Sequence, residues 1–452
     1  MSFDYELPDG WSWKTIEEVQ ESPKGATITG PFGSSIGKKF FVEKGVPVIR
    51  GNNLSLGMTP FIDDGFVYVS EEKADELKRY KSIADDLLFT AAGTIGQVGI
   101  IPKKSKYDEY IISNKQLRAR LDTTVVDPTY AYYWFSSKPM VEYIKRQDTG
   151  STIPLINLGV LRSLPLPVPP LDVQVRIRKI LKSFDKKIWI NTQTNQTLEA
   201  MAQAIFKSWF VDFDPVKAKM NGEQPEGMDE ATASLFPDKL AESQVGLIPE
   251  GWSVNQLSDI CKNHSQSYDL KSVDEVVFVN TGDVLEGDFL HKDYSPVVGL
   301  PGQAKKAIKE DDILYSEIRP KNKRFAYVDF DVSDYVVSTK FMVIQANEKV
   351  HPRLLYMMLT RQNTIDEFNV IADSRSGTFP QITFKAISNL EFCMAPRKVQ
   401  DAFVAQVMPM IQLQRSLKTE NKRLAELRDT LLPKLLSGEI ELGQAQELAE
   451  VE

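Results

Sequence analysis

Two stretches of sequence decide how this chain is organised: "STIPLINLGVLRSLPLPVPP" at residues 151–170 and "GTFPQITFKAISNLEFCMAP" at residues 377–396. They align without a gap at an offset of 226 residues, and each is followed by a long helical pattern. Internal repeats are sought before motifs because a repeat sets the architecture of the whole fold. The match therefore indicates that one structural unit occurs twice.

Further matches support a duplication. "DDLLFT" at 85–90 meets "DDILYS" at 311–316 at the same offset of 226, and "LPDGW" at 7–11 returns as "IPEGW" at 248–252 at an offset of 241. The second copy has therefore lost 15 residues between its opening turn and residue 311. The two halves share a frame and differ in their interiors.

Each half reads as a globular part followed by one long helix. Short runs typical of strands, such as "GVPVIRG" and "KFMVIQ", alternate with Gly, Pro, Asn and Asp, and one helical stretch comes late in each part. We expect the α+β class: a tandem repeat of two α+β domains joined by two long antiparallel coiled-coil helices. The expected segments are domain 1 at 1–170, spacer helix 1 at 171–210, an acidic linker at 211–247, domain 2 at 248–396, spacer helix 2 at 397–437 and an acidic tail at 438–452.

The two helices carry an unbroken 4-3 spacing of apolar residues, which predicts the seam of a coiled coil. The apolar seam positions are Ile177, Leu181, Phe184, Ile188, Leu198 and Ile205 in the first helix, and Phe403, Val407, Leu417, Leu424, Leu431 and Leu435 in the second. Polar residues interrupt both seams near the middle. The alternative is two ordinary amphipathic helices packed on separate domains, but each would be about 58 Å long, far above the globular mean.

Charge and composition restrict the function classes. The 452 residues carry a net charge of −8, of which residues 211–250 contribute −6 and residues 437–452 contribute −5, which leaves +3 for the rest. The rest of the chain, long helices included, is therefore mildly basic, which permits nucleic acid as a partner. No apolar run is long enough for a membrane span, the first residues do not resemble a signal peptide, and the two cysteines suggest a reducing compartment. We expect a cytoplasmic protein with no membrane partner.

Catalytic motifs are missing. "GSSIGKKF" at 33–40 is one residue too short for a phosphate loop, "GTIGQVG" at 93–99 lacks the dinucleotide-binding spacing, and the three histidines are scattered without metal-ligand spacing. We therefore expect no catalytic residue, no metal and no cofactor in this chain, which favours a reader or a scaffold.

Basic and amide residues gather on the expected turns, where they suit guanine, adenine and phosphate contacts. The candidates for DNA binding are Lys38, Lys39, Arg50, Asn52, Asn53, Lys115, Gln116 and Arg118 in the first half, and Lys305, Lys306, Arg319, Lys321, Asn322, Lys323 and Arg324 in the second. A solvated charged face is the other interpretation of any one cluster. The recurrence of such clusters in both variable regions favours DNA.

The whole chain resembles the specificity subunits of type I restriction-modification enzymes. The resemblance rests on the doubled "LPDGW"/"IPEGW", "GTIG" at 93–96, "GST" at 150–152 with "SGT" at 376–378, "PLPVPPLDVQVRI", and "LLPKLLSGEI" at 431–440. One departure is that the first helix ends in "FKSWFVDFDPV" and not in the Leu-Ser-Gly-Glu-Ile ending of the second, which leaves its boundary open.

The resemblance implies a non-catalytic adaptor. Two target recognition domains would each read one half of an asymmetric, bipartite site in double-stranded DNA, and the helices would set the spacer and dock two modification (methyltransferase) subunits. Those subunits would bind S-adenosylmethionine, while restriction subunits would use ATP and Mg for translocation and cleavage. The alternative function is a stand-alone sequence-specific DNA-binding protein or a coiled-coil scaffold without restriction partners.

Overall fold

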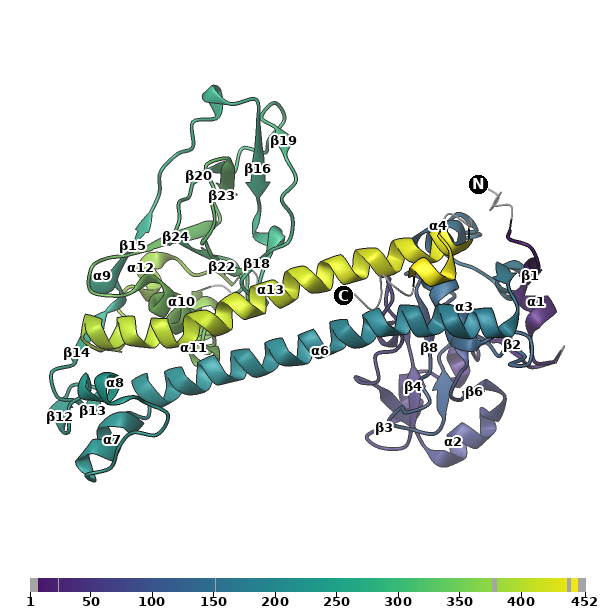
Figure 1. The fold of residues 1–452 in the computed structure, drawn as a ribbon, viewed down its shortest axis with the longest axis horizontal. Helices are drawn as coiled ribbons and strands as arrows, with labels where there is room; N and C mark the ends of the chain where they lie inside the picture. The colour runs from purple at the N-terminus through teal and green to yellow at the C-terminus, as the bar shows by residue number, and fades with distance from the viewer. Residues whose placement is uncertain (1–6, 23, 151, 376–379, 437–439, 446–452) are drawn as a thin grey trace. The chain divides into compact units, whose positions relative to one another are not determined.

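The computed structural model describes residues 7–22, 24–150, 152–375, 380–436 and 440–445. The chain forms two compact units, unit 1 from residues 1–194 with 416–452, and unit 2 from residues 195–415. Each of the two long helices, α6 (Leu171–Phe210) and α13 (Arg397–Leu436), contributes residues to both units (Figure 1). Both helices are 40 residues long.

In the described residues, unit 1 contains two larger sheets beside a two-stranded one. The first is antiparallel with the order β2-β10-β7-β8, and the second has the order β3-β5-β4-β9-β6, in which β4 and β9 run parallel. The bounds are β2 (Thr27–Thr29), β3 (Phe41–Val42), β4 (Val46–Ile49), β5 (Val67–Val69), β6 (Lys81–Ser82), β7 (Leu87–Thr90), β8 (Val98–Ile100), β9 (Tyr110–Ile112) and β10 (Gln116–Ala119). All four residues of β7 are buried, as expected for a strand covered on both faces.

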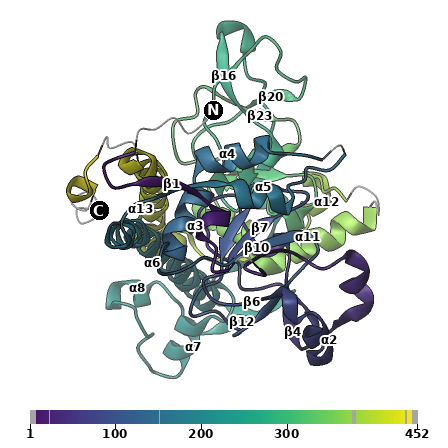
Figure 2. The ribbon, with the colours of Figure 1, turned by 90° about the vertical axis from the view of Figure 1, so that its right-hand side faces the viewer.

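Helices cover these sheets. They are α1 (Ile16–Val19), α2 (Glu71–Glu76), α3 (Pro128–Ser136), α4 (Lys138–Arg146) and α5 (Leu158–Ser163). In Figure 2, α4 and α5 are seen above β7 and β10, and β6, β4 and α2 below them. Strand β1 (Ser12–Thr15), which follows the first opening turn, pairs antiparallel with β11 (Pro165–Val168), which is the "PLPV" before α6. The beginning of the domain and the start of its helix are thereby tied together.

Unit 2 repeats this plan. The antiparallel sheet β15-β24-β21-β22 is joined by a second sheet β19-β16-β23-β20 with a parallel β16–β23 pair. The bounds are β15 (Cys261–His264), β16 (Glu275–Val279), β17 (Val284–Leu285), β18 (Asp288–Phe289), β19 (Ser295–Pro296), β20 (Ala304–Ala307), β21 (Ile313–Ser316), β22 (Phe325–Tyr327), β23 (Tyr335–Ser338), β24 (Phe341–Ala346), α9 (Leu257–Ile260), α10 (Pro352–Thr360), α11 (Gln362–Arg375) and α12 (Phe384–Ile387). β14 (Ser253–Gln256) pairs with β25 (Glu391–Met394) as β1 pairs with β11.

The helices are paired antiparallel within each unit. In unit 1, Arg428 Nη1 donates to Asp185 Oδ1 at 2.5 Å, and Asn191 Nδ2 donates to Asn421 Oδ1 at 3.0 Å, so residue numbers rise along one helix as they fall along the other. The tandem α+β plan with two long antiparallel helices, expected from the sequence, is confirmed.

The seam is a mixture of buried apolar and buried polar positions. Fully or nearly fully buried are Ile177, Leu181, Phe184, Leu424, Leu431 and Leu435 in unit 1, and Phe403 and Val407 in unit 2. The other expected seam residues, Ile188, Leu198, Ile205 and Leu417, are half-buried. Asn191 is only 3% exposed, and its amide is satisfied by Asn421 and by Glu420 Oε2 at 2.8 Å. The polar seam positions therefore pair with each other across the helices.

The segment 211–247, expected as an acidic linker, is folded onto unit 2. It holds α7 (Asp214–Met220), α8 (Glu230–Ser234) and β12 (Leu240–Ser243), which pairs with β13 (Gly246–Pro249). Figure 1 shows α7 and α8 beside the end of α6. Val216 and Phe236 are buried in the same core as Trp209 and Trp252, so apolar anchors between the acids hold the segment down.

Candidate nucleic-acid interface

In unit 1, strands of both sheets end at one place. Gly30 N donates to Gln116 O at 2.9 Å, Ser113 N donates to Ile49 O at 2.9 Å, and Thr90 N donates to Gln97 O at 3.1 Å. These bonds bring together residues 30–36, 50–53, 90–97 and 113–116, which we call turn cluster 1. Four separate segments thus form one surface at the end of the strands.

Buried amides hold turn cluster 1 in place. Gln116 Nε2 donates to Thr90 Oγ1 at 3.2 Å, and that hydroxyl donates to Gln97 Oε1 at 2.9 Å. Gln97 Nε2 in turn donates to the carbonyls of Gly51 at 3.2 Å and Leu54 at 2.9 Å. A polar network that is satisfied in this way fixes the relative positions of the segments that it joins.

The surface of turn cluster 1 presents basic and amide side chains. Asn52, Asn114 and Lys115 are exposed, and Arg50 is half-exposed. Arg50 Nη2 reaches only Gly65 O, at 3.4 Å, and among the described residues its buried Nε has no hydrogen-bond partner. The buried Nε lies out of reach of a ligand, and the terminal nitrogens of this half-exposed guanidinium are the donors that a ligand could meet.

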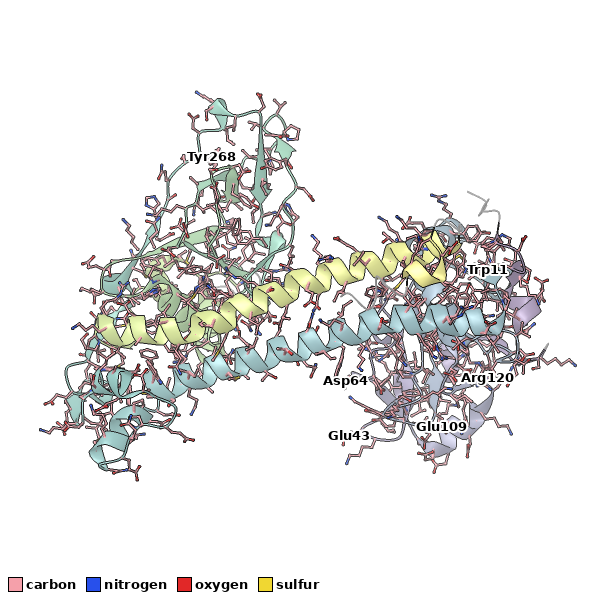
Figure 3. The ribbon with its side chains drawn as sticks, viewed as in Figure 1. Trp11, Glu43, Asp64, Glu109, Arg120 and Tyr268 are labelled. Carbon is pink, nitrogen blue, oxygen red and sulfur yellow. The ribbon has the colours of Figure 1, made fainter. Side chains whose placement is uncertain are left out.

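The local charge is positive. Residues 30–39, 50–53, 90–97 and 113–116 contain Lys38, Lys39, Arg50 and Lys115 and no carboxylate. The neighbouring Asp64 forms an ion pair with Lys106 at 3.6 Å. Figure 3 shows Asp64 and Arg120 on opposite sides of unit 1, which agrees with Arg120 following the far end of β10.

Three expected DNA-binding residues of unit 1 belong to the framework and not to the surface. Gln116 lies in the buried network, and Asn53 Nδ2 donates to Ile62 O and Asp64 O at 3.0 and 2.8 Å. Arg118 is 4% exposed, its two terminal nitrogens bond to the carbonyls of Lys81 and Gly25, and burial lowers the pKa of its guanidinium. These three side chains are therefore not part of the proposed interface.

Lys38 and Lys39 lie on η2 (Lys38–Phe40), which follows the first segment of turn cluster 1. Both are exposed. Lys39 Nζ lies 4.8 Å from the centre of the Phe40 ring, and Lys73 of α2 lies 4.1 Å from the same centre. Lys38 and Lys39 therefore lie beside turn cluster 1, on the side of α2.

In unit 2, the corresponding surface is the turn between β21 and β22, residues 317–324, which we call turn 2. It contains η7 (Pro320–Asn322), and its exposed side chains are Arg319, Lys321 and Asn322. Arg319 N donates to Pro380 O at 3.1 Å, and Lys321 N donates to Asn369 Oδ1 at 2.8 Å. Turn 2 is thus anchored near its start and at its centre.

Turn 2 has an unusual backbone. Arg319 has a φ of 44° and Lys323 a φ of 52°, the left-handed region that favours glycine. The corresponding turn of unit 1 has glycines there: Gly93 has a φ of 98°, Gly96 a φ of 92°, and Gly93 N donates to Pro154 O at 2.9 Å. Both turns thus use positive φ angles at two positions, and in unit 2 these positions carry cationic side chains at a cost of about 1–2 kcal/mol per residue.

The remaining basic candidates of unit 2 are only partly free. Arg324 Nη1 donates to Gly282 O and Val284 O at 3.0 and 2.9 Å, and Lys323 forms an ion pair with Glu286 at 2.9 Å. Lys306 Nζ donates to Phe341 O at 2.6 Å, and burial lowers the pKa of its ammonium. Lys305, in contrast, is exposed on β20.

Gln97 and Asn114 are site residues that sequence reasoning did not select. Gln97 carries the buried network, and nothing in its sequence context distinguishes a structural amide from a surface one.

Among the described residues, there is no group of three His, Cys, Asp or Glu side chains that could hold a metal ion. Within the same residues, no helix is both long and apolar enough to cross a membrane.

Comparisons with known proteins give a consistent family. Residues 8–200 and 249–427 match the family described as "Type I restriction modification DNA specificity domain". The specificity subunit of the type I restriction enzyme HindI from Haemophilus influenzae is 49% identical over 160 residues, which are 35% of this chain and 35% of that subunit. The MjaIX specificity subunit from Methanocaldococcus jannaschii is 25% identical over 447 residues, which cover 97% of this chain and 95% of that one.

A solved structure shares the fold. The crystal structure of the S subunit of a type I restriction-modification system from M. genitalium superposes with a TM-score of 0.51 at 16% identity, and the alignment covers 96% of this chain and 98% of that one. At this identity the likeness concerns the fold alone.

Proposed function

The chain belongs to the family of type I restriction-modification DNA specificity domains and is the specificity subunit of such a system; on this basis we propose that each unit reads one half of a two-part DNA sequence. The resemblance noted in the sequence is thereby confirmed at the level of the family. The single observation that carries the proposal is the duplicated turn between neighbouring strands, glycine-based in unit 1 and cationic in unit 2.

The side chains of the two turns support reading of base edges. Arginine and lysine donate to guanine, and asparagine forms paired hydrogen bonds with adenine in the major groove. Turn cluster 1 offers Arg50, Asn52 and Asn114, and turn 2 offers Arg319 and Asn322. Because the residues differ between the units, the two half-sites differ and the whole site is asymmetric.

The long helices act as the ruler between the half-sites. Each helix contributes residues to both units, which supports its role as the ruler in this proposal. Removing one heptad from each helix shortens the pair by about 10 Å, which corresponds to about three base pairs. We expect methylation mapping of such a variant to show a shorter spacer with both half-sites unchanged; altered half-sites would contradict the ruler.

The partners proposed are double-stranded DNA, two modification subunits and the restriction subunits, all in the cytoplasm. The chain itself is non-catalytic in this proposal, and S-adenosylmethionine, ATP and Mg are bound by the partner subunits. Exposed apolar residues on the two helices, among them Trp189 at 62% and Leu413 at 46% exposure, are suited to docking the modification subunits.

One experiment tests the proposal. The chain is co-expressed with a modification subunit of the same system in a host that lacks adenine methylation, and the genome is then mapped for methylated adenines. We expect one asymmetric bipartite motif with the pair and none with either protein alone. Methylation by this chain alone would make it an enzyme. Absence of any motif, with retained DNA binding or helix pairing, would favour a stand-alone DNA-binding protein or a scaffold.

A further inference from the structure

We propose that Phe32 is a DNA-inserting side chain, which enters the base stack next to the half-site read by unit 1 and partly unstacks one base step. This inference rests on the proposed function. It assigns to unit 1 a second mode of reading, through the deformability of the DNA, beside the hydrogen bonds of turn cluster 1.

Phe32 stands out from the surface of the unit. Its side chain is 84% exposed, although the neighbouring Pro31 and Ile36 are buried. Full burial of a phenylalanine contributes about 1.5–3 kcal/mol, so an aromatic ring that is left in water forgoes that stabilisation in the free protein. Insertion between bases would remove the ring from water.

The backbone that carries Phe32 is tightly held. Ser35 N donates to Phe32 O at 2.8 Å, and Gly30 N donates to Gln116 O at 2.9 Å. A Cβ atom added at Gly30 would lie 1.8 Å from Ser113 O, so the chain presses directly onto the neighbouring segment of turn cluster 1. The loop that carries the ring is ordered before binding, so its ordering costs no further entropy when DNA binds.

The surroundings of Phe32 fit DNA better than a protein partner. The ring belongs to the segments that contain four cations and no carboxylate, and Asn114 lies against the next residue, with its Nδ2 3.2 Å from a Cβ built at Gly33. Lysines of this kind contact phosphates and set the register, while apolar residues such as phenylalanine wedge between base steps and kink the duplex.

Insertion has a consequence for specificity. Pyrimidine–purine steps unstack more easily than other steps, so a wedge favours them at a position that no hydrogen bond reads. We therefore expect the methylated motif to show a preference for such a step at one position beside the half-site of unit 1.

The test uses the full chain assembled with its modification subunit and duplexes that carry the wild-type motif, with 2-aminopurine placed in turn at each position around the half-site of unit 1. The variants are Phe32→Ala and Phe32→Leu. The matched control is Ile83→Ala, because Ile83 is 43% exposed and lies at the opposite end of the strands of unit 1.

We expect wild-type complex to raise 2-aminopurine fluorescence at one step, Phe32→Ala to abolish this signal, and Phe32→Leu to keep part of it. Base–aromatic stacking predicts that Phe32→Ala weakens binding by between about fivefold and about 150-fold. The slope of binding against salt stays unchanged, since no phosphate contact is lost. Ile83→Ala behaves as wild type, and the melting temperature of Phe32→Ala is unchanged because its ring is exposed.

Two results would overturn the inference. The first is a Phe32→Ala complex that binds, unstacks and methylates as wild type does. The second is a Phe32→Ala chain that keeps DNA binding and fails to assemble with the modification subunit, which would make the loop a protein-docking surface. A wild-type complex without any bipartite motif would refute the proposed function itself, and this outcome is recognised before the variants are compared.

Discussion

Replacing Arg319 by glycine is expected to make unit 2 more stable and to weaken DNA binding at the same time. Arg319 has a φ of 44° and a ψ of 79°, and its side chain is exposed, so little packing is lost with it. Relief of the left-handed conformation is worth about 1–2 kcal/mol, and the greater freedom of glycine in the unfolded chain takes back about 0.5–1 kcal/mol. The net gain is therefore about 0.5–1 kcal/mol.

The loss in binding has a separate origin. If the guanidinium of Arg319 reads a base, its removal costs about 1–3 kcal/mol of binding and relaxes one position of one half-site. Arg319→Ala separates the two effects, because alanine removes the same donors and keeps a side chain with the strained backbone. We expect both variants to lose binding equally, and only Arg319→Gly to gain stability.

The assays are hydrogen exchange of the amides of β21 and β22, which reports the stability of unit 2 alone, and methylation mapping of the assembled complex. A local measurement is needed because a chain with two units does not unfold in one step. The reasoning is refuted if Arg319→Gly is no more stable than Arg319→Ala, or if the motif of both variants equals that of the wild type.

Two further predictions concern pH and close packing. His351 Nδ1 accepts from Arg353 N at 3.1 Å at the start of α10, and burial lowers the pKa of its imidazole. Its contribution to stability is therefore present above about pH 6.5 and is lost as the pH falls through the lowered folded-state pKa. His351→Asn keeps an acceptor and should remove this acid-side loss in unfolding free energies obtained from hydrogen exchange of the α10 amides between pH 5 and 8. Gly30→Ala forces its Cβ against Ser113 O and should destabilise unit 1 by about 1–3 kcal/mol in hydrogen exchange of the β10 amides. Gly282→Ala, at a position with open space, is its control and should leave the stability unchanged.

The repeat and the helices were predictable from the sequence because both depend on periodicity. A constant offset and a 4-3 spacing survive any divergence of the loops, and the spacing predicts that α6 packs against α13. The helix bounds expected at 171–210 lie where α6 begins and ends.

The roles of single polar residues could not be predicted in the same way. The sequence places Gln116 and Arg118 on an expected turn, but both lie in β10, whose four residues are all buried. Burial on both faces is a property of the tertiary structure, and no local pattern reports it. The exposure of Phe32 is equally invisible, since an apolar residue near a strand normally predicts core.

The composition of unit 1 from two distant parts of the chain affects how the protein is made. Unit 2 is continuous in sequence, whereas unit 1 needs residues 416–452 beside residues 1–194. A ribosome adds about 5–20 residues per second. Roughly 12–50 seconds therefore pass between the synthesis of Leu181 and Phe184 and the synthesis of Leu424 and Leu431, which cover them in the folded unit. The first half to be translated is thus the last to be completed, and until then it carries an uncovered apolar helix face that a chaperone or a second nascent chain can bind.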